Sequence, residues 1–274
     1  MKPLHIRLRW LMLAAVVCLS CQYFVVAADE PTLTKEQIKQ FLLTAKVIAN
    51  KESQKGVTHT TRLTLSNGTI THDASFQPID QHKREMKLES GATVFSFVDS
   101  YKFNIAAYAL SEMLGIDDML PVYVERKWQG TTGSLSWWLP VKMDEADRMK
   151  QNITPPNQEA WNKQIYKVRV FDQLIDDTDA NLTNVLIGPD WQIWRIDFTR
   201  AFRTSKDLQK PAELLQCERH LFENLKQLNG SELEAKAKNY LTKDEIQTLM
   251  TRRDKIVAHF DALIKERGEK GVLY

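Results

Sequence analysis

Three polar residues in one short stretch of the chain have types and spacing that suit chemistry on a bound cation. Asn184 lies five positions after Asp179, and Asp197 lies thirteen positions after Asn184. An amide oxygen next to a carboxylate suits Mg²⁺ or Mn²⁺, because both ions prefer hard oxygen ligands. The other carboxylate, Asp179, would then accept the proton of an attacking hydroxyl group or help to position a substrate.

A β-hairpin is expected to bring Asn184 and Asp197 together. Two short apolar runs flank the turn sequence Gly188-Pro189-Asp190-Trp191. If the hairpin is symmetric about the last two of these turn residues, paired positions sum to 381 and Asn184 faces Asp197. The sequence therefore predicts that both ligands lie at one end of a two-stranded ribbon, with Asp179 in the loop before it.

The stretch Val170–Arg203 resembles the catalytic centre of the protein-kinase-like superfamily. Its D-x-x-x-x-N spacing, followed by I-D-F, is similar to the motifs that carry the base and the metal ligands of kinases. The nearest similarity is to the atypical branch that includes HipA-like kinases and the secretory-pathway casein kinases; phosphoinositide kinases also carry I-D-F. The upstream segment Tyr101–Arg126 resembles the regulatory helix, turn and strand of the same branch.

This resemblance implies an α+β, two-lobed protein-kinase-like fold with a β-rich small N-lobe and a helical C-lobe. It also implies ATP or another nucleotide as phosphoryl donor, with Mg²⁺ or Mn²⁺ as cofactor. The acceptor would be a hydroxyl group of a protein, a glycan or a metabolite. In this scheme Asp179 is the catalytic residue, and Asn184 and Asp197 hold the metal.

Two positions that carry charge in such kinases hold neutral amides here. Gln77 occupies the expected slot of the small-lobe lysine, and Asn104 that of the regulatory-helix glutamate. Both are predicted to line the nucleotide site, where their N–H groups can donate to phosphate oxygens. Such a pair supplies no positive charge, so it stabilises developing phosphoryl charge less well. Lys83, Lys102 and Arg62 are candidates to compensate.

The motif around Asp197 also departs from the kinase pattern. D-F-G has become Asp197-Phe198-Thr199, and the loss of glycine reduces the backbone freedom of this loop. Arg200 follows directly and could either reach a phosphate or pair with an acidic neighbour, and the second interpretation is favoured.

Two functions remain open at this point. Retention of Asp179, Asn184 and Asp197 favours an exported phosphotransferase. Replacement of the lysine–glutamate pair favours a pseudokinase that acts as an extracytoplasmic binding or scaffold module. The first interpretation is preferred by a small margin.

The N-terminus has the layout of a secretory signal peptide over residues 1–28. Basic residues precede an uncharged run, and Val26-Ala27-Ala28 supplies small residues before the expected cleavage point. An uncleaved anchor is the next alternative and a lipoprotein start at Cys21 the third. All three place the protein outside the cytoplasm, with membrane contact expected if the segment is retained.

The net charge and the cysteine content limit the partners and the cellular compartment that are expected for this protein. Removal of residues 1–28, with three basic residues and no acidic one, changes the formal net charge from +2 to −1, so no nucleic-acid partner is expected. Cys217 would be the one cysteine left, which excludes an intrachain disulfide in the processed chain. An exported protein without disulfides is more typical of bacteria, so a periplasmic or secreted bacterial protein is expected.

The expected organisation is an N-terminal helix and small lobe over residues 29–139, followed by a helical large lobe over residues 140–274. Asn67-Gly68 between alternating segments predicts a β-hairpin in the small lobe. A helix is expected at 34–51, and a loop or exposed helix at 81–90. Further helices are expected at 99–114, 144–151, 158–176, 213–228, 231–241 and 243–266, with paired strands at 120–127 and 133–139.

Overall fold

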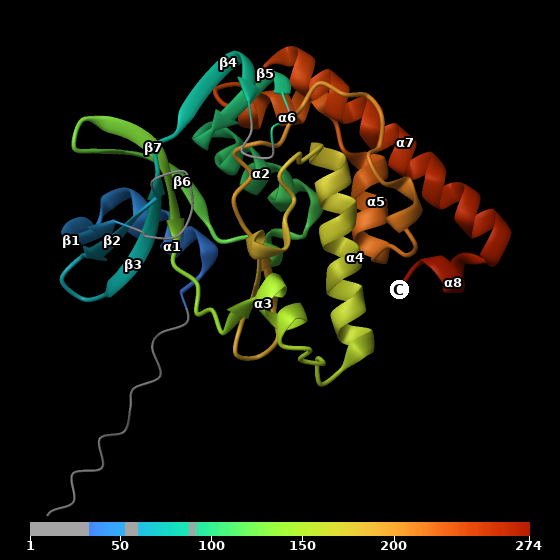
Figure 1. Cartoon of the computed structure of the whole chain (residues 1–274), viewed down its shortest axis with the longest axis horizontal. Helices are drawn as coiled ribbons and strands as arrows, with labels where there is room; N and C mark the ends of the chain where they lie inside the picture. The colour runs from blue at the N-terminus through green and yellow to red at the C-terminus, as the bar shows by residue number, and fades with distance from the viewer. Residues whose placement is uncertain (1–32, 53–59, 88–90, 92) are drawn as a thin grey trace, which may run out of the picture. The chain divides into compact units, whose positions relative to one another are not determined.

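Alternating apolar and polar residues on both sides of Asn67-Gly68 form the central hairpin of an antiparallel sheet, as the computed structural model shows (Figure 1). Leu63 and Leu65 of one strand and Ala74 and Phe76 of the next are buried, and all four belong to the core. The strand order is β1-β2-β3-β7-β6. The strands are β1 (Lys46–Glu52), β2 (Thr61–Ser66), β3 (Thr71–Gln77), β6 (Tyr123–Trp128) and β7 (Thr131–Trp137).

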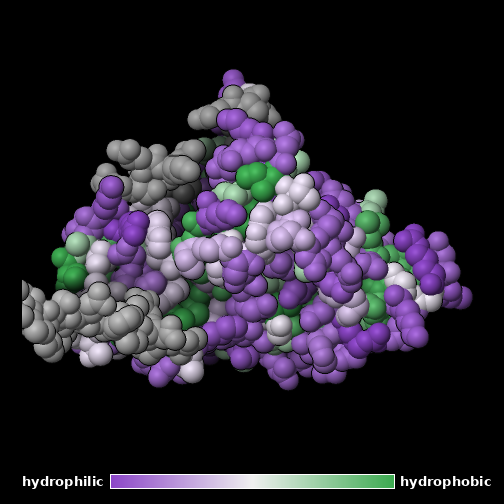
Figure 2. Space-filling view, turned by 90° about the horizontal axis from the view of Figure 1, so that it is seen from below, coloured by the Kyte–Doolittle hydropathy of each residue, from purple (hydrophilic) through white to green (hydrophobic). Residues whose placement is uncertain are grey.

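The structure describes residues 33–52, 60–87, 91 and 93–274, and the segment from Leu33 to Tyr274 is one compact unit. The expected signal peptide or anchor at 1–28 lies outside the described residues. Within the described ranges, no helix has both the length and the apolar character needed to cross a membrane. The face shown in Figure 2 is mostly hydrophilic, and its hydrophobic residues are scattered.

The first helix is shorter than the sequence pattern predicts. Helix α1 (Lys35–Thr44) begins with the expected capping box, in which Thr34 and Gln37 exchange hydrogen bonds. The prediction of a helix up to residue 51 is wrong, because the chain turns at Ala45 and pairs as β1 with β2. The β-branched pair Val47 and Ile48 favours this strand over a further helical turn.

A separate two-stranded ribbon follows the hairpin. Strand β4 (Asp80–Lys87) pairs antiparallel with β5 (Thr93–Ser100), so the prediction of a loop or exposed helix at 81–90 is wrong over the described part. Helix α2 (Tyr101–Leu114) begins directly after β5 with Ser100 as its N-cap. It ends at Gly115, whose φ of 68° closes the helix in the left-handed region.

The C-terminal part is helical, with one small sheet of order β10-β9-β8. Helix α4 packs against the long helix α7, which begins with the predicted capping box of Thr242 and Glu245 (Figure 1). The α-helices are α3 (Glu145–Lys150), α4 (Gln158–Ile175), α5 (Arg219–Gln227), α6 (Gly230–Ala237), α7 (Lys243–Arg267) and α8 (Glu269–Val272). The short strands are β8 (Met143–Asp144), β9 (Val185–Ile187) and β10 (Ile193–Arg195), and the 3-10 turns are η1 (Asp117–Met119), η2 (Leu182–Asn184) and η3 (Pro211–Glu213).

An antiparallel-sheet N-terminal part and a helical C-terminal part make this an α+β fold, which confirms the predicted fold class. The hairpin of β9 and β10 lies between α4 and the chain that leads to α5. Asp179 and Asn184 precede this hairpin and Asp197 follows it, whereas Gln77 ends β3 and Asn104 lies in α2.

The close approach of β7 to the end of β3 yields a testable prediction. A Cβ added at Gly133 would lie 2.6 Å from the carbonyl oxygen of Gln77 and 2.9 Å from the Cα of Pro78. Gly133→Ala is therefore expected to lower the free energy of unfolding by about 1–3 kcal/mol, measured by urea denaturation. Gly271→Ala is the matched control, because its nearest neighbour would be at 3.7 Å, and a comparable loss there would contradict this explanation.

Candidate active site

The hairpin forms as predicted, but its register differs by one position. Ile187 pairs with Ile193 and Val185 with Arg195, so paired positions sum to 380. The turn holds three residues rather than two, because Gly188 and Gln192 are joined by a hydrogen bond and Trp191 has a φ of 68°. The prediction that Asn184 faces Asp197 in the ladder is therefore wrong.

Ile196, not Asp197, occupies the position opposite Asn184, and its N–H donates to the Asn184 carbonyl at 3.0 Å. Asp197 follows with a φ of 58°, a left-handed conformation that is uncommon for a residue with a side chain. This turn carries the Asp197 side chain out of the ladder, and the Thr199 hydroxyl donates to its Oδ1 at 3.0 Å. Burial raises the pKa of Asp197, and the neighbouring Asp99 carboxylate raises it further.

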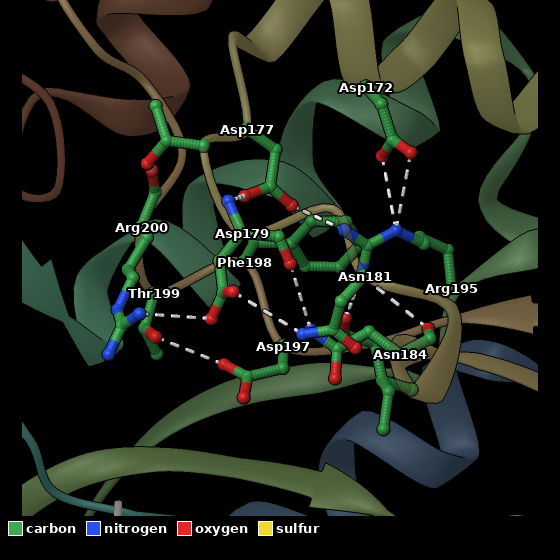
Figure 3. A network of polar contacts seen from close by, with 12 residues as sticks. Asp172, Asp177, Asp179, Asn181, Asn184, Arg195, Asp197, Phe198, Thr199 and Arg200 are labelled. Atoms are coloured by element: carbon green, nitrogen blue, oxygen red, sulfur yellow. Dashed lines mark hydrogen bonds and ion pairs between the residues drawn. The ribbon is translucent and has the colours of Figure 1, made fainter. Parts of the chain in front are cut away.

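Asn184 and Asp179 are joined directly. The side-chain amide of Asn184 donates to the Asp179 carbonyl oxygen at 3.3 Å. This contact orients the buried Asn184 side chain, and its Oδ1 accepts no hydrogen bond from the described residues. The half-exposed Asp179 carboxylate also accepts a hydrogen bond from the Asn181 amide at 3.3 Å. Figure 3 shows both amides next to Asp179, with the Asp197 carboxylate close by.

A fully buried guanidinium group holds the loop that carries these residues. Arg195 pairs with Asp172 of α4 at 3.1 Å and with Asp177 of the following loop (Figure 3). It also donates to the carbonyl groups of Asn184 and Ile196. One side chain therefore connects α4, the loop of residues 176–181 (the expected catalytic loop) and the residues that adjoin both strands of the hairpin.

Burial and the neighbouring charges shift the pKa values of the groups in this cluster. Burial raises the pKa of Asp177 to about 7, although the attraction of Arg195 opposes this shift. Burial also raises the pKa of Asp172. Burial alone would lower the pKa of Arg195, but the two carboxylates reverse that effect and raise it. The guanidinium is therefore held in its charged form behind the site.

The two predicted nucleotide-binding amides are buried but do not bond to each other. Gln77 donates to the Thr60 hydroxyl at 3.3 Å and accepts from the Ile79 N–H at 3.3 Å. Asn104 donates to the Ser134 hydroxyl at 3.1 Å. Its Oδ1 accepts from the Phe198 N–H at 2.8 Å. Asn104 thus fastens α2 to the residue after Asp197, while Gln77 supports the chain that leaves β3.

Arg200 lies beside the site and pairs with acidic neighbours, as the sequence interpretation favours. Its Nε lies 3.3 Å from Asp99 Oδ2, and its Nη1 lies 3.3 Å from Asp179 Oδ2. The three side chains proposed as compensating cations are engaged elsewhere: Arg62 pairs with Asp73, Lys102 with Asp80, and Lys83 contacts Met86.

The donor set suits a hard divalent cation better than a metal such as Zn²⁺ that prefers nitrogen and sulfur ligands. Among the residues that the structure describes, no three His, Cys, Asp or Glu side chains are grouped to hold a metal. Asn184 and Asp197 together offer an amide oxygen and a carboxylate. Mg²⁺ is typically bound by one or two carboxylates, waters and substrate phosphates, so this set matches its requirements.

The antiparallel-sheet part and the helical part correspond to the predicted small and large lobes, and the D-x-x-x-x-N and I-D-F residues flank the β9–β10 hairpin. No protein family description matches the sequence, and no curated protein is significantly similar to it. Among solved structures, a hydra Fam20 determined with sugar is 15% identical over 87% of this chain and 91% of that chain, with a TM-score of 0.64. The Helicobacter pylori proinflammatory kinase CtkA is 10% identical over 81% of this chain and 98% of that chain, with a TM-score of 0.49.

The similarity to Fam20 covers most of both chains and shows a shared fold. It confirms the predicted two-lobed kinase-like fold. The assignment of Asp179, Asn184 and Asp197 to particular roles is a proposal, developed below.

Several residues of the site are not among the predicted ones. Arg195, Asp172 and Asp177 form the buried cluster, and Asp99 reaches the site from the end of β5. One signal for Arg195 was present: it is the one charged residue within the apolar run Ile193–Ile196. A charge in the middle of a buried strand requires a partner, so an acidic cluster nearby could have been inferred.

The buried cluster gives a prediction for stability. Arg195→Met leaves Asp172 and Asp177 buried without their cation, so a loss of about 3–5 kcal/mol in the free energy of unfolding is expected from urea denaturation. Arg169→Met is the matched control, because Arg169 is partly exposed and its nearest carboxylate is 3.8 Å away. The control should cost less than about 1 kcal/mol. Equal losses in the two variants would show that Arg195 has no special role.

Proposed function

We propose that this chain is an exported kinase-like phosphotransferase that moves a phosphoryl group from a nucleotide to a hydroxyl acceptor. The observation that supports this proposal best is the convergence of Asp179, Asn184 and Asp197 on one end of the hairpin, within a kinase-like fold (Figure 3). The register of the hairpin does not pair Asn184 with Asp197. The left-handed turn at Asp197 instead takes its carboxylate out of the ladder, where Oδ1 accepts a hydrogen bond from the Thr199 hydroxyl.

In this proposal Asp179 orients the acceptor hydroxyl and accepts its proton. Its carboxylate is half-exposed, which suits contact with an incoming substrate. The Asn181 amide and Arg200 each contact one of its oxygens, so its orientation is fixed before the acceptor arrives. Fixed orientation of a reacting group lowers the entropy cost of reaching the transition state.

Asn184 and Asp197 are proposed to hold Mg²⁺ or Mn²⁺. The Asn184 amide nitrogen is bonded to the Asp179 carbonyl, so its oxygen is the atom presented for a cation. Such an ion, when bound, would neutralise charge on the donor phosphates. Gln77 and Asn104 are proposed to line the nucleotide site, with Asn104 also holding Phe198 in place.

The acceptor is proposed to be a protein, a glycan or a metabolite with a free hydroxyl group. The similar hydra Fam20 was determined with sugar, which places glycans among the first acceptors to test. The layout of residues 1–28 supports export to the periplasm or the exterior of a bacterial cell.

A pseudokinase function is the second candidate, and one observation favours it. Gln77 and Asn104 are both engaged in neutral hydrogen bonds at the positions where active kinases hold a lysine–glutamate ion pair. The fold and a metal site would then serve binding rather than turnover. Metal-dependent nucleotide binding without transfer to any acceptor would support this alternative.

Nucleotide binding can be tested by thermal shift. ATP with Mg²⁺ or Mn²⁺ should raise the Tm, since a ligand at a hundred times its Kd adds about 2.7 kcal/mol to the stability of the folded state. The shift should disappear without metal and in Asp197→Ala. Asp261→Ala, on an exposed part of α7, should keep it. No shift with any nucleotide would contradict both the phosphotransferase and a nucleotide-binding pseudokinase.

Catalysis can be separated from binding at Asp179. Asp179→Asn keeps the size of the side chain but removes the proton acceptor, so kcat should fall by a factor of about 10²–10⁴ while the nucleotide-induced Tm shift is retained. Turnover is measured as nucleotide consumption with glycan and protein acceptors, and Asp261→Asn is the control. Full turnover in Asp179→Asn would exclude Asp179 as the base.

A further inference from the structure

The two described residues expected to contact the donor phosphates, Gln77 and Asn104, supply no cation of the kind that kinases use there. Gln77 and Asn104 are neutral, buried and already bonded to protein groups. Arg195 is charged but fully buried behind the catalytic loop, where its partners are Asp172 and Asp177. A triphosphate carries several negative charges, so a site for it needs a positive group that a ligand can reach.

Arg200 meets this requirement. Its backbone carbonyl accepts hydrogen bonds from the Thr178 N–H at 3.4 Å and the Thr178 hydroxyl at 3.0 Å, which holds residue 200 against the catalytic loop. Its side chain is 24% exposed, so a ligand can contact it, whereas that of Arg195 is fully buried. Figure 3 shows the side chains of Arg200, Asp179 and Asp197 converging on the same space.

The contacts of Arg200 are weak enough to be exchanged. Its ion pairs with Asp99 and Asp179 both measure 3.3 Å, longer than the roughly 2.7–2.9 Å of a strong charge-assisted hydrogen bond. A guanidinium group has five N–H donors, and the described residues use two of its three nitrogens. Arg200 therefore has donors left for a second anionic partner.

Asp99 provides a fixed anchor for this side chain. It is 2% exposed, and its Oδ1 is buried without a hydrogen-bond partner among the described residues. Among the described residues Arg200 is the cation paired with this buried carboxylate, and removing it would leave the charge uncompensated, so Asp99 attracts Arg200 strongly. Phe97, whose ring centre lies 5.3 Å from the Arg200 guanidinium carbon, supports the same position. Arg200 can then release Asp179 and still remain bound to Asp99.

We infer that Arg200 is the phosphate-binding cation of this site and takes the role of the small-lobe lysine, at whose expected position Gln77 stands. In the free protein Arg200 pairs with Asp179, and an arriving triphosphate takes that place on the guanidinium. The exchange frees the Asp179 carboxylate to accept the proton of the acceptor hydroxyl, so donor binding prepares the base. This inference rests on the proposed function, because it assumes that a nucleotide binds at this site.

The test compares the binding of two ligands to three proteins. Calorimetry measures the Kd of Mg²⁺–ATP and of Mg²⁺–tripolyphosphate for the unaltered chain, Arg200→Gln and Arg203→Gln. Arg203 is the matched control, because it lies in the same loop, removes the same charge and contacts the Ser96 carbonyl instead of Asp179. Arg200→Gln should weaken both ligands at least about tenfold, as expected for lost charge-assisted hydrogen bonds. Arg203→Gln should change either Kd by less than about threefold.

Each outcome distinguishes this inference from the proposed function. Unaltered affinity in Arg200→Gln, or an equal loss in Arg203→Gln, would overturn the inference and leave the phosphotransferase intact. Absence of binding of both ligands to the unaltered chain would overturn the two together. If Arg200→Gln does not fold, Arg200→Met decides in its place: it also removes the charge, so a loss of at least about tenfold is expected, and unchanged affinity overturns the inference.

Discussion

The buried ion cluster around Arg195 is the interaction on which the rest of the site depends. It joins Asp172 of α4 to Asp177 of the catalytic loop and binds two backbone carbonyls of the hairpin. Taking these charges out of water is costly, so the cluster is stable only if every partner is in place. The position of the loop therefore depends on α4 and the hairpin as well as on the residues of the loop itself.

A second connection links the site to the small lobe. The Asn104 amide spans from Ser134 on β7 to the Phe198 N–H beside Asp197, and the Ser100 N–H donates to the Thr199 carbonyl at 2.8 Å. In many kinases a lysine–glutamate ion pair helps to hold the site together. Here neutral hydrogen bonds have that structural role. If the proposed function holds, the positive charge for the donor phosphates comes from another group, and Arg200 is the one we infer.

The sequence is informative where local chemistry decides the structure. Asn67-Gly68 and the capping boxes at Thr34 and Thr242 predicted their elements correctly, because turns and caps depend on a few adjacent residues. The hairpin at Gly188 was predicted correctly, but the predicted register was wrong by one position. A three-residue loop with Trp191 in a left-handed conformation shifts every pair by one position, and no glycine marks that conformation.

Tertiary contacts account for the other differences. The segment after Ala45 forms an edge strand because β2 is available to pair with it, and β4 is a strand because β5 returns beside it. The partners of Gln77 and Asn104 come from Thr60, Ile79, Ser134 and Phe198, whose proximity no spacing rule reveals. Prediction from the sequence therefore identified the polar residues of the hairpin but not the ionic framework behind them.

The left-handed backbone at Asp197 has one more consequence. An L-residue with a side chain adopts this conformation at a cost of order 1–3 kcal/mol, and surrounding contacts must sustain it. Here the neighbouring residues are tied down on both sides, with Ile196 bonded to Asn184 and Phe198 to Asn104. The backbone around Asp197 is thus held in one conformation before a ligand binds. Binding therefore does not have to order this loop.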